Sequence, residues 1–134
     1  MDVTYVRYQS PTPNSRGAFT GIFGLVNNLA RDGLLTPAEE GFRRTNNDWY
    51  DASYTDPTTV DPTVYDRAIN PLAASWFRSG AADWLLAPLP GYLQILHTHQ
   101  VACVEVRSPD PGRIIYSDDH QIVVVPHRDF RQDG

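Results

Sequence analysis

Five residues near the C-terminus, Gln121–Val125, constrain the fold most, because the last four in succession are aliphatic. A strand with apolar side chains on both faces is typical of the centre of a sheet, or of a strand covered on both sides. Pro126 ends the run, since proline has no N–H to donate to a neighbouring strand. The sequence therefore predicts a sheet in which this strand is covered.

Three other short segments have the composition of strands. Residues 101–107 alternate apolar and polar side chains, residues 114–116 form a brief apolar run, and residues 3–8 are β-branched and aromatic. Between the first two lies a turn that contains two prolines and Gly112. We predict an α+β fold: a sheet of about four mostly antiparallel strands, made from the N-terminal strand and a C-terminal three-strand meander, with helices packed on one face.

The apolar spacing predicts two helices in the N-terminal half. Residues 18–32 carry aliphatic side chains at i, i+3, i+4 and i+7, and Gly33 follows where a left-handed C-cap is favoured. Thr36 and Glu39 have the spacing of a capping box, which predicts a second helix over residues 37–46.

In the C-terminal half, residues 72–86 repeat apolar side chains at helical spacing for three turns and predict the longest helix; residues 91–99 predict another. The predicted core comprises Ile22, Leu25, Leu29, Trp76, Phe77, Trp84, Leu93, Leu96, Val104, Val106, Val123 and Val125.

Length and charge limit the domain organisation and the partners. A chain of 134 residues predicts a single domain over residues 1–126 and a polar tail over residues 127–134. The net charge of −5 disfavours nucleic acid as a partner, and no apolar run is long enough for a membrane span. We expect a cytoplasmic monomer or homodimer without a cofactor. The sequence contains no lysine, which excludes Schiff-base and P-loop chemistry.

Residues 47–67 are acidic and aromatic, and we interpret them as a long ordered loop. Aspartate recurs every five residues, twice before proline, which is typical of residues that cap turns. The alternatives are that these carboxylates bind calcium or act in pairs as acid and base. Aromatic side chains are common in binding surfaces because they supply contact area at a small entropic cost. The candidate binding residues of this segment are Asn47, Trp49, Tyr50, Asp51, Tyr54 and Tyr65.

Arginines form a second candidate set on the predicted sheet. If the N-terminal strand pairs with the meander, Arg7 and Arg107 share a face, with Arg113 on the next strand. Guanidinium groups bind carboxylate and phosphate in a bidentate manner. The alternative is a solvated face with cross-strand ion pairs.

Histidine and cysteine give little support for a metal site. His97 and His99 lie two residues apart, a spacing that directs the two rings to different faces of a helix. Cys103 lies in a predicted strand, where a structural thiol is the simpler interpretation.

Several segments resemble known proteins. The patterns NNDWYDASY, VDPTVYDRAINPLAASWF and PGRIIYSDDHQIVVVP resemble a group of small bacterial proteins without an assigned activity. Residues 21–36, GIFGLVNNLARDGLLT, are similar to the N-terminal helix and GLL turn of DarT-like ADP-ribosyltransferases. Those enzymes place a catalytic glutamate near their late strands, where this chain has Gln121 and aliphatic residues.

Two hypotheses about function follow. In the first, the chain is a non-catalytic binding domain whose acidic aromatic loop meets a protein partner. In the second, it is a small enzyme, with an arginine anchoring an anionic small molecule. A polar cavity lined by arginines and a carboxylate of perturbed pKa favours the enzyme, and a flat exposed aromatic patch favours the binding domain.

Overall fold

The computed structural model describes residues 4–53, 55–80 and 86–127. They form two compact units, which are considered separately. The first comprises residues 4–7, 55–80 and 106–127, and the second comprises residues 8–53 and 86–105.

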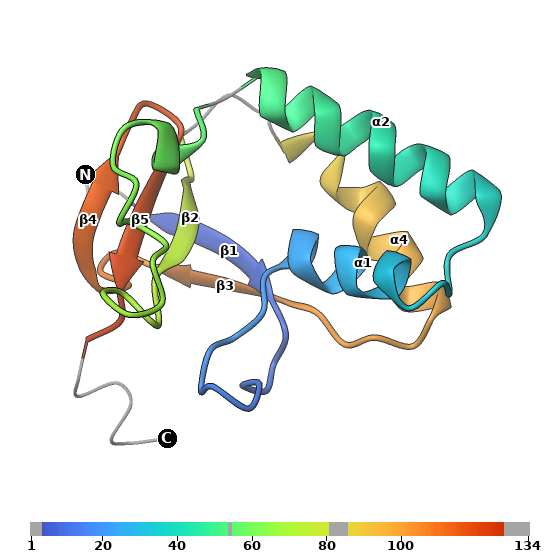
Figure 1. Cartoon of the computed structure of the whole chain (residues 1–134), viewed down its shortest axis with the longest axis horizontal. Helices are drawn as coiled ribbons and strands as arrows, with labels where there is room; N and C mark the ends of the chain where they lie inside the picture. Colours follow the sequence, from blue (N-terminus) through green and yellow to red (C-terminus); the bar gives the residue numbers. More distant parts are fainter. Residues whose placement is uncertain (1–3, 54, 81–85, 128–134) are drawn as a thin grey trace. The chain divides into compact units, whose positions relative to one another are not determined.

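The sheet has five strands in the order β3-β1-β2-β5-β4 (Figure 1). Their bounds are β1 Tyr5–Gln9, β2 Ala74–Arg78, β3 Val104–Ser108, β4 Arg113–Ser117 and β5 Gln121–Val125. The pairs β1–β2, β2–β5 and β4–β5 are antiparallel. The predicted α+β class is confirmed, with one strand more than expected.

Strand β5 occupies the covered position that its sequence predicts. It lies between β2 and β4, and Ile122, Val123 and Val124 are fully buried. Since adjacent side chains point to opposite faces, burial of three in succession shows that both faces of this strand are covered. Gly112 lies so close to β5 that a Cβ there would meet the carbonyl oxygen of Val125 at 2.3 Å.

The predicted helix over residues 72–86 is wrong, because its first half forms the inner strand β2. Trp76 and Phe77 are both buried although they point to opposite faces of the sheet, with Trp76 opposite Ile122 and Phe77 opposite Gln121 on β5. A strand buried on both faces matches the i, i+3, i+4 pattern by coincidence, and aromatic residues favour strands. The rest of the prediction, including Trp84, falls largely outside the described residues.

The predicted C-terminal meander is confirmed for β4 and β5, which are antiparallel neighbours, and is wrong for β3. Strand β3 lies at one edge of the sheet beside β1, whereas β4 lies at the opposite edge. β4 has only β5 as a neighbour, and β3 pairs with the N-terminal strand β1 in place of β4. The edge position explains why Val104, predicted to be core, is 40% exposed.

Part of the predicted loop over residues 47–67 belongs to the first unit and consists of consecutive turns. Asp56, Asp61 and Asp66 each accept a hydrogen bond from the backbone N–H two residues later, at 2.9, 3.0 and 2.8 Å. The five-residue period therefore reflects repeated aspartate-capped turns, including the short 3-10 helix η1, Pro57–Thr59. The turn-cap interpretation holds for these three residues.

The second unit contains three helices within the described residues: α1 Ile22–Arg31, α2 Pro37–Ser53 and α4 Leu89–Thr98 (Figure 1). Gly33 has a φ of 71°, and the N–H groups of Gly33 and Leu34 bond to the carbonyl oxygens of Ala30 and Leu29. These bonds form a Schellman motif, which ends α1 as the sequence predicts.

Helix α2 begins with the predicted capping box. The N–H of Thr36 donates to Glu39 at 2.8 Å, and the N–H of Glu39 donates to the hydroxyl of Thr36 at 3.2 Å. The helix then continues seven residues beyond the predicted end at Asn46, so the first third of the predicted loop is helical. Tertiary packing overrides the low helix propensity of Asn46 and Asn47.

That packing is aromatic and joins all three helices. The rings of Phe23 on α1 and Phe42 on α2 meet the ring of Tyr92 on α4 edge-on, with centroids 5.1 and 5.2 Å apart. Tyr50, 4% exposed, meets Phe23 at 4.9 Å. Burial of Tyr50 is the reason that α2 extends past residue 46, because aromatic pairs in these geometries stabilise packing beyond the buried area alone.

The predicted core is partly correct. Ile22, Leu29, Trp76, Phe77, Leu96 and Val123 are buried, whereas Leu25, Leu93, Val106 and Val125 are half-buried. Within the described residues, no helix is long and apolar enough to cross a membrane.

Candidate functional site

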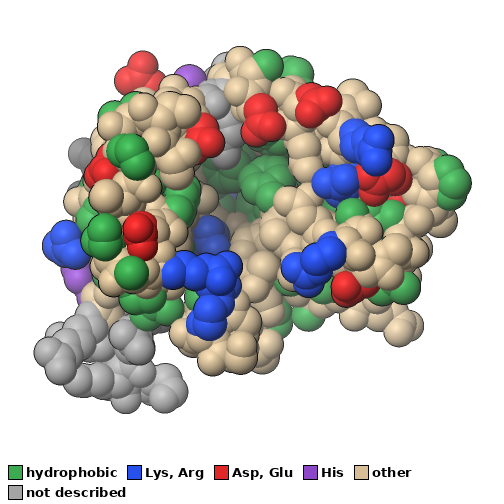
Figure 2. All heavy atoms as spheres, in the orientation of Figure 1, with side chains coloured by type: hydrophobic (Ala, Val, Ile, Leu, Met, Phe, Trp, Pro, Cys, Tyr) green, Lys and Arg blue, Asp and Glu red, His purple; other side chains and the backbone are tan. Residues whose placement is uncertain are grey.

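An open cleft of about 530 Å³ lies between α1 and α2 in the second unit. Helix α1 contributes Asn27, Ala30 and Arg31, and helix α2 contributes Glu40, Arg43 and Arg44. The loop between the two helices closes one end with Gly33 and Leu35. Basic side chains, in blue, lie next to acidic side chains, in red, on the helical part of the surface at the right of Figure 2.

A single carboxylate holds two arginines at this cleft. Glu40 accepts hydrogen bonds from Nη2 and Nε of Arg43 at 2.5 and 3.2 Å, and from Nε of Arg44 at 2.9 Å. Their spacing along α2, i to i+3 and i to i+4, brings these side chains together on one helix. Hydrogen bonds from Arg43 and then Arg44 lower the pKa of Glu40 to about 2, so the carboxylate stays ionised near neutral pH.

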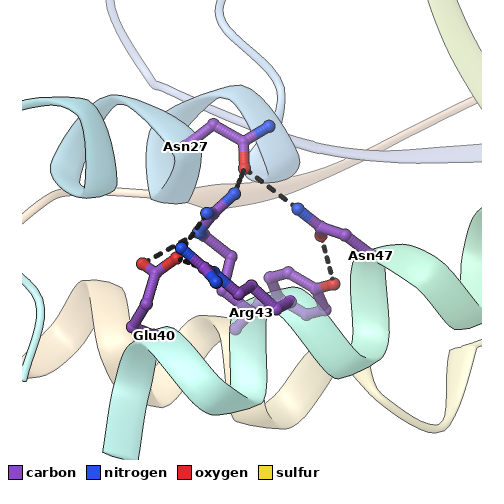
Figure 3. A network of polar contacts seen from close by, with 6 residues as sticks. Asn27, Glu40, Arg43 and Asn47 are labelled. Atoms are coloured by element: carbon purple, nitrogen blue, oxygen red, sulfur yellow. Dashed lines mark hydrogen bonds and ion pairs between the residues drawn. The ribbon is translucent and has the colours of Figure 1, made fainter. Parts of the chain in front are cut away.

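The polar network continues from Arg43 into the helix packing. Nη1 of Arg43 and Nδ2 of Asn47 both donate to Oδ1 of Asn27, each at 3.1 Å. Asn27 points from α1 toward the two α2 residues in Figure 3. Tyr92 donates its hydroxyl hydrogen to Oδ1 of Asn47 at 2.7 Å, and burial raises the pKa of Tyr92. One face of the cleft is thus fixed to the aromatic core.

Two arginines of the cleft keep donors that have no partner within the described part of the chain. Nε of Arg44 bonds to Glu40, but its terminal nitrogens extend into solvent, and the side chain is 74% exposed. Arg31 has only a long contact of 3.8 Å with Asp32 and is 72% exposed. The cleft therefore combines one fixed guanidinium group, Arg43, with two that are available to a ligand.

A contact between Glu39 and His99 fixes the start of α2. Nε2 of His99, the C-cap of α4, lies 2.9 Å from Oε1 of Glu39. The hydrogen bond with His99, followed by the backbone bond from Thr36, lowers the pKa of Glu39. Glu39 thus completes the helix cap and contacts α4, and it does not line the cleft.

The structure separates the predicted loop residues. Asn47, Trp49, Tyr50 and Asp51 lie on α2, and Tyr54 lies outside the described residues. Asn47 belongs to the network that borders the cleft, but Tyr50 is core and Trp49 is half-buried, with its ring 5.0 Å from that of Tyr50. These aromatic residues do not form a flat exposed patch.

Tyr65 belongs to the first unit. Its side chain is 38% exposed, and desolvation raises its pKa, opposed by a hydrogen bond with Ser75. Val60 and Ile69, in the same turn-rich segment, are more exposed.

The predicted arginine face is also divided. Arg7 on β1 donates from Nη1 to the carbonyl oxygen of Ser75 on β2 at 2.8 Å. Arg107 lies on β3 and Arg113 on β4, the two opposite edge strands of the sheet. The structure therefore does not gather the three arginines into one anion site.

The turn between β4 and β5 contains a second polar cluster, but its groups are satisfied internally. Asp118 accepts hydrogen bonds from the N–H groups of His120 and Gln121 and from the hydroxyl of Tyr116. Gln121, the buried polar residue of β5, donates to the carbonyl oxygen of Thr55 at 2.8 Å. Desolvation, then the bond to Asp118, raises the pKa of Tyr116 to about 12. This cluster fixes residue 55 to the sheet.

The described residues contain no group of three or more histidine, cysteine or carboxylate side chains arranged to hold a metal ion. No protein-family model, no curated protein and no solved structure matches the chain. The candidate site is therefore argued from its geometry.

Sequence reasoning missed the cleft residues Arg31, Glu40, Arg43 and Arg44. A signal was present, since a glutamate followed by arginines at i+3 and i+4 predicts ion pairs on one helix face. Which residues of α1 lie opposite these side chains depends on how the two helices pack, and no local sequence pattern reveals it.

Proposed function

We propose that the chain is a binding domain without catalytic activity that holds an anionic group, carboxylate or phosphate, in the cleft between α1 and α2. The observation that carries this proposal is the charge of the cleft. Three arginines and one glutamate line it, so it has a positive balance in a chain whose net charge is −5. A planar guanidinium group donates two parallel hydrogen bonds to a pair of carboxylate or phosphate oxygens.

Binding is favoured over catalysis by the state of Glu40, the carboxylate that lines the cleft. A general acid or base works best with a pKa near the operating pH, whereas the pKa of Glu40 is lowered to about 2 and its oxygens accept from two arginines. An enzyme acting on an anionic substrate is thereby the less favoured hypothesis.

A protein partner is a second candidate for the first unit. Val60 and Ile69 are 66% and 58% exposed in the segment whose aspartates cap successive turns. Exposed aliphatic residues beside acidic ones suit a partner with basic and apolar side chains. Binding by this segment is independent of the cleft.

The proposal is tested by titrating the chain with inorganic phosphate at low ionic strength and measuring the heat of binding by calorimetry. Arg44→Gln removes an exposed cleft cation, and we expect it to weaken binding about 10-fold or more, because a hydrogen bond to a charged group contributes about 1.5–3 kcal/mol. Arg67→Gln is the matched control, since Arg67 is an exposed arginine outside the cleft.

The control variant is expected to bind as the unmodified chain does. Equal loss in both variants would indicate non-specific attraction, and absence of saturable binding in the unmodified chain would disprove the proposal. Far-UV circular dichroism establishes that both variants are folded.

A further inference from the structure

The inference concerns Glu40 and rests on the proposed function of the cleft. Glu40 is itself an anionic group bound to the arginines that a ligand needs. Each nitrogen of Arg43 already donates a hydrogen bond, Nε and Nη2 to Glu40 and Nη1 to Asn27. A ligand therefore gains the Nε–Nη2 edge of Arg43 only by replacing Glu40.

We propose that Glu40 is an internal competing anion, and that the cleft takes ligands carrying a dianionic phosphate group, which offers the arginines enough charge and acceptors to displace it. Glu40 occupies Arg43 and Arg44 when no ligand is bound. On binding, the phosphate group takes over these donors, and the Glu40 side chain turns into solvent.

The competition lowers the affinity of every anionic ligand, and a simple carboxylate has the least to offset this cost. Such a ligand offers the arginines the same chemical group as Glu40, but Glu40 is tethered to the same helix, three and four residues away. Tethering gives an effective concentration of about millimolar or more, which a free monocarboxylate has to exceed.

A dianionic phosphate group overcomes this advantage by charge and by number of acceptors. It has three or more acceptor oxygens, and Arg31 and the terminal nitrogens of Arg44 supply donors that Glu40 leaves unused. Charge-assisted hydrogen bonds are about twice as strong as neutral ones. The Glu40 side chain is already 28% exposed, so its displaced carboxylate regains water without unfolding of α2.

Protonation cannot remove Glu40 near neutral pH. The hydrogen bonds from the two arginines keep its carboxylate ionised, with a pKa of about 2. Selection therefore depends on the ligand's charge and acceptors.

The decisive variant is Glu40→Gln, with Glu39→Gln as the matched control. Glu39 precedes Glu40 in the first turn of α2, and its substitution by glutamine changes the net charge by the same amount. Glu39 does not line the cleft. Inorganic phosphate, phenyl phosphate and acetate are titrated by calorimetry at pH 8, where the phosphate groups are largely dianionic. The two phosphates distinguish a site for the free ion from a site for a phosphate ester.

We expect Glu40→Gln to bind both phosphates about 10-fold more tightly than the unmodified chain and to bind acetate more tightly as well, because every ligand that takes the arginines has to displace Glu40. Glu39→Gln should change the affinities by less than about threefold. Glu40→Asp, which keeps the charge but shortens the side chain, should lie between the unmodified chain and Glu40→Gln; it also serves as the test if Glu40→Gln fails to fold.

The outcomes separate the two proposals. If the unmodified chain binds phosphate and Glu40→Gln binds it equally or more weakly, Glu40 organises the arginines and the competing-anion proposal is wrong, while the anion cleft stands. If neither protein binds any of the three probes, the proposed function itself fails.

Discussion

Truncation of Trp76 tests the central packing of the first unit. Trp76 is 8% exposed and packs with Tyr5, Ile122 and Val124, which come from β1 and from β5. Trp76→Ala removes an indole ring from a position between two strands, where the backbone cannot collapse into the space. Truncation of a buried aromatic side chain costs about 3–5 kcal/mol. That is a large part of the roughly 5–15 kcal/mol that stabilises a folded domain.

The assay is urea denaturation followed by far-UV circular dichroism, because fluorescence changes when a tryptophan is removed. With an m-value of about 2 kcal/mol/M, the expected loss lowers the midpoint by about 1.5–2.5 M. Trp49→Ala is the comparison. Trp49 is half-buried on α2, with an edge-on contact to Tyr50, so we expect its truncation to cost about 1–2 kcal/mol.

A loss below about 1.5 kcal/mol for Trp76→Ala, or an equal loss for both variants, would contradict the packing described for β2. The same curves test the predicted single domain over residues 1–126. One transition supports it, and two separate transitions would show that the two compact units unfold independently.

Two further predictions concern local stability. Gln100 follows the end of α4 with a φ of 59°, in a Schellman motif that favours glycine. We therefore expect Gln100→Gly to stabilise the chain by about 1 kcal/mol in urea denaturation. Destabilisation would contradict this. Burial raises the pKa of Asp118, but hydrogen bonds from the N–H of His120 and the hydroxyl of Tyr116 outweigh it, and the pKa lies below the ordinary value of 3.8. Its stabilisation is therefore complete above about pH 4 and is lost as the pH falls through the lowered pKa. Asp118→Asn should flatten this acid dependence, and an unchanged pH profile of unfolding would refute the assignment.

The parts of the fold that the sequence predicts correctly depend on local chemistry. The capping box of Thr36 and Glu39, the left-handed Gly33 and the strand Gln121–Val125 each follow from a few adjacent residues. In each case the backbone preference and the hydrophobic pattern agree, so the position in the fold follows from the sequence alone.

The errors occur where distant contacts decide. Residues 74–78 satisfy a helical spacing because both faces of β2 are buried, and only the neighbours β1 and β5 reveal the strand. Likewise, Asn46 and Asn47 are poor helix formers by themselves. They are helical because Tyr50 is buried against Phe23 and because Asn47 bonds to Asn27.

The candidate cleft illustrates the same division between local and distant information. The ion pairs of Glu40 with Arg43 and Arg44 are encoded within five residues of one helix, so local spacing is sufficient to indicate them. Asn27 turns these pairs into one wall of a cleft, and its contact with Arg43 spans 16 residues and two helices. That contact depends on how α1 packs on α2, where the ring of Phe23 meets the rings of Tyr50 and Tyr92 edge-on. The aromatic residues of α2 thus support the candidate site from the core, by fixing the helices that carry its arginines.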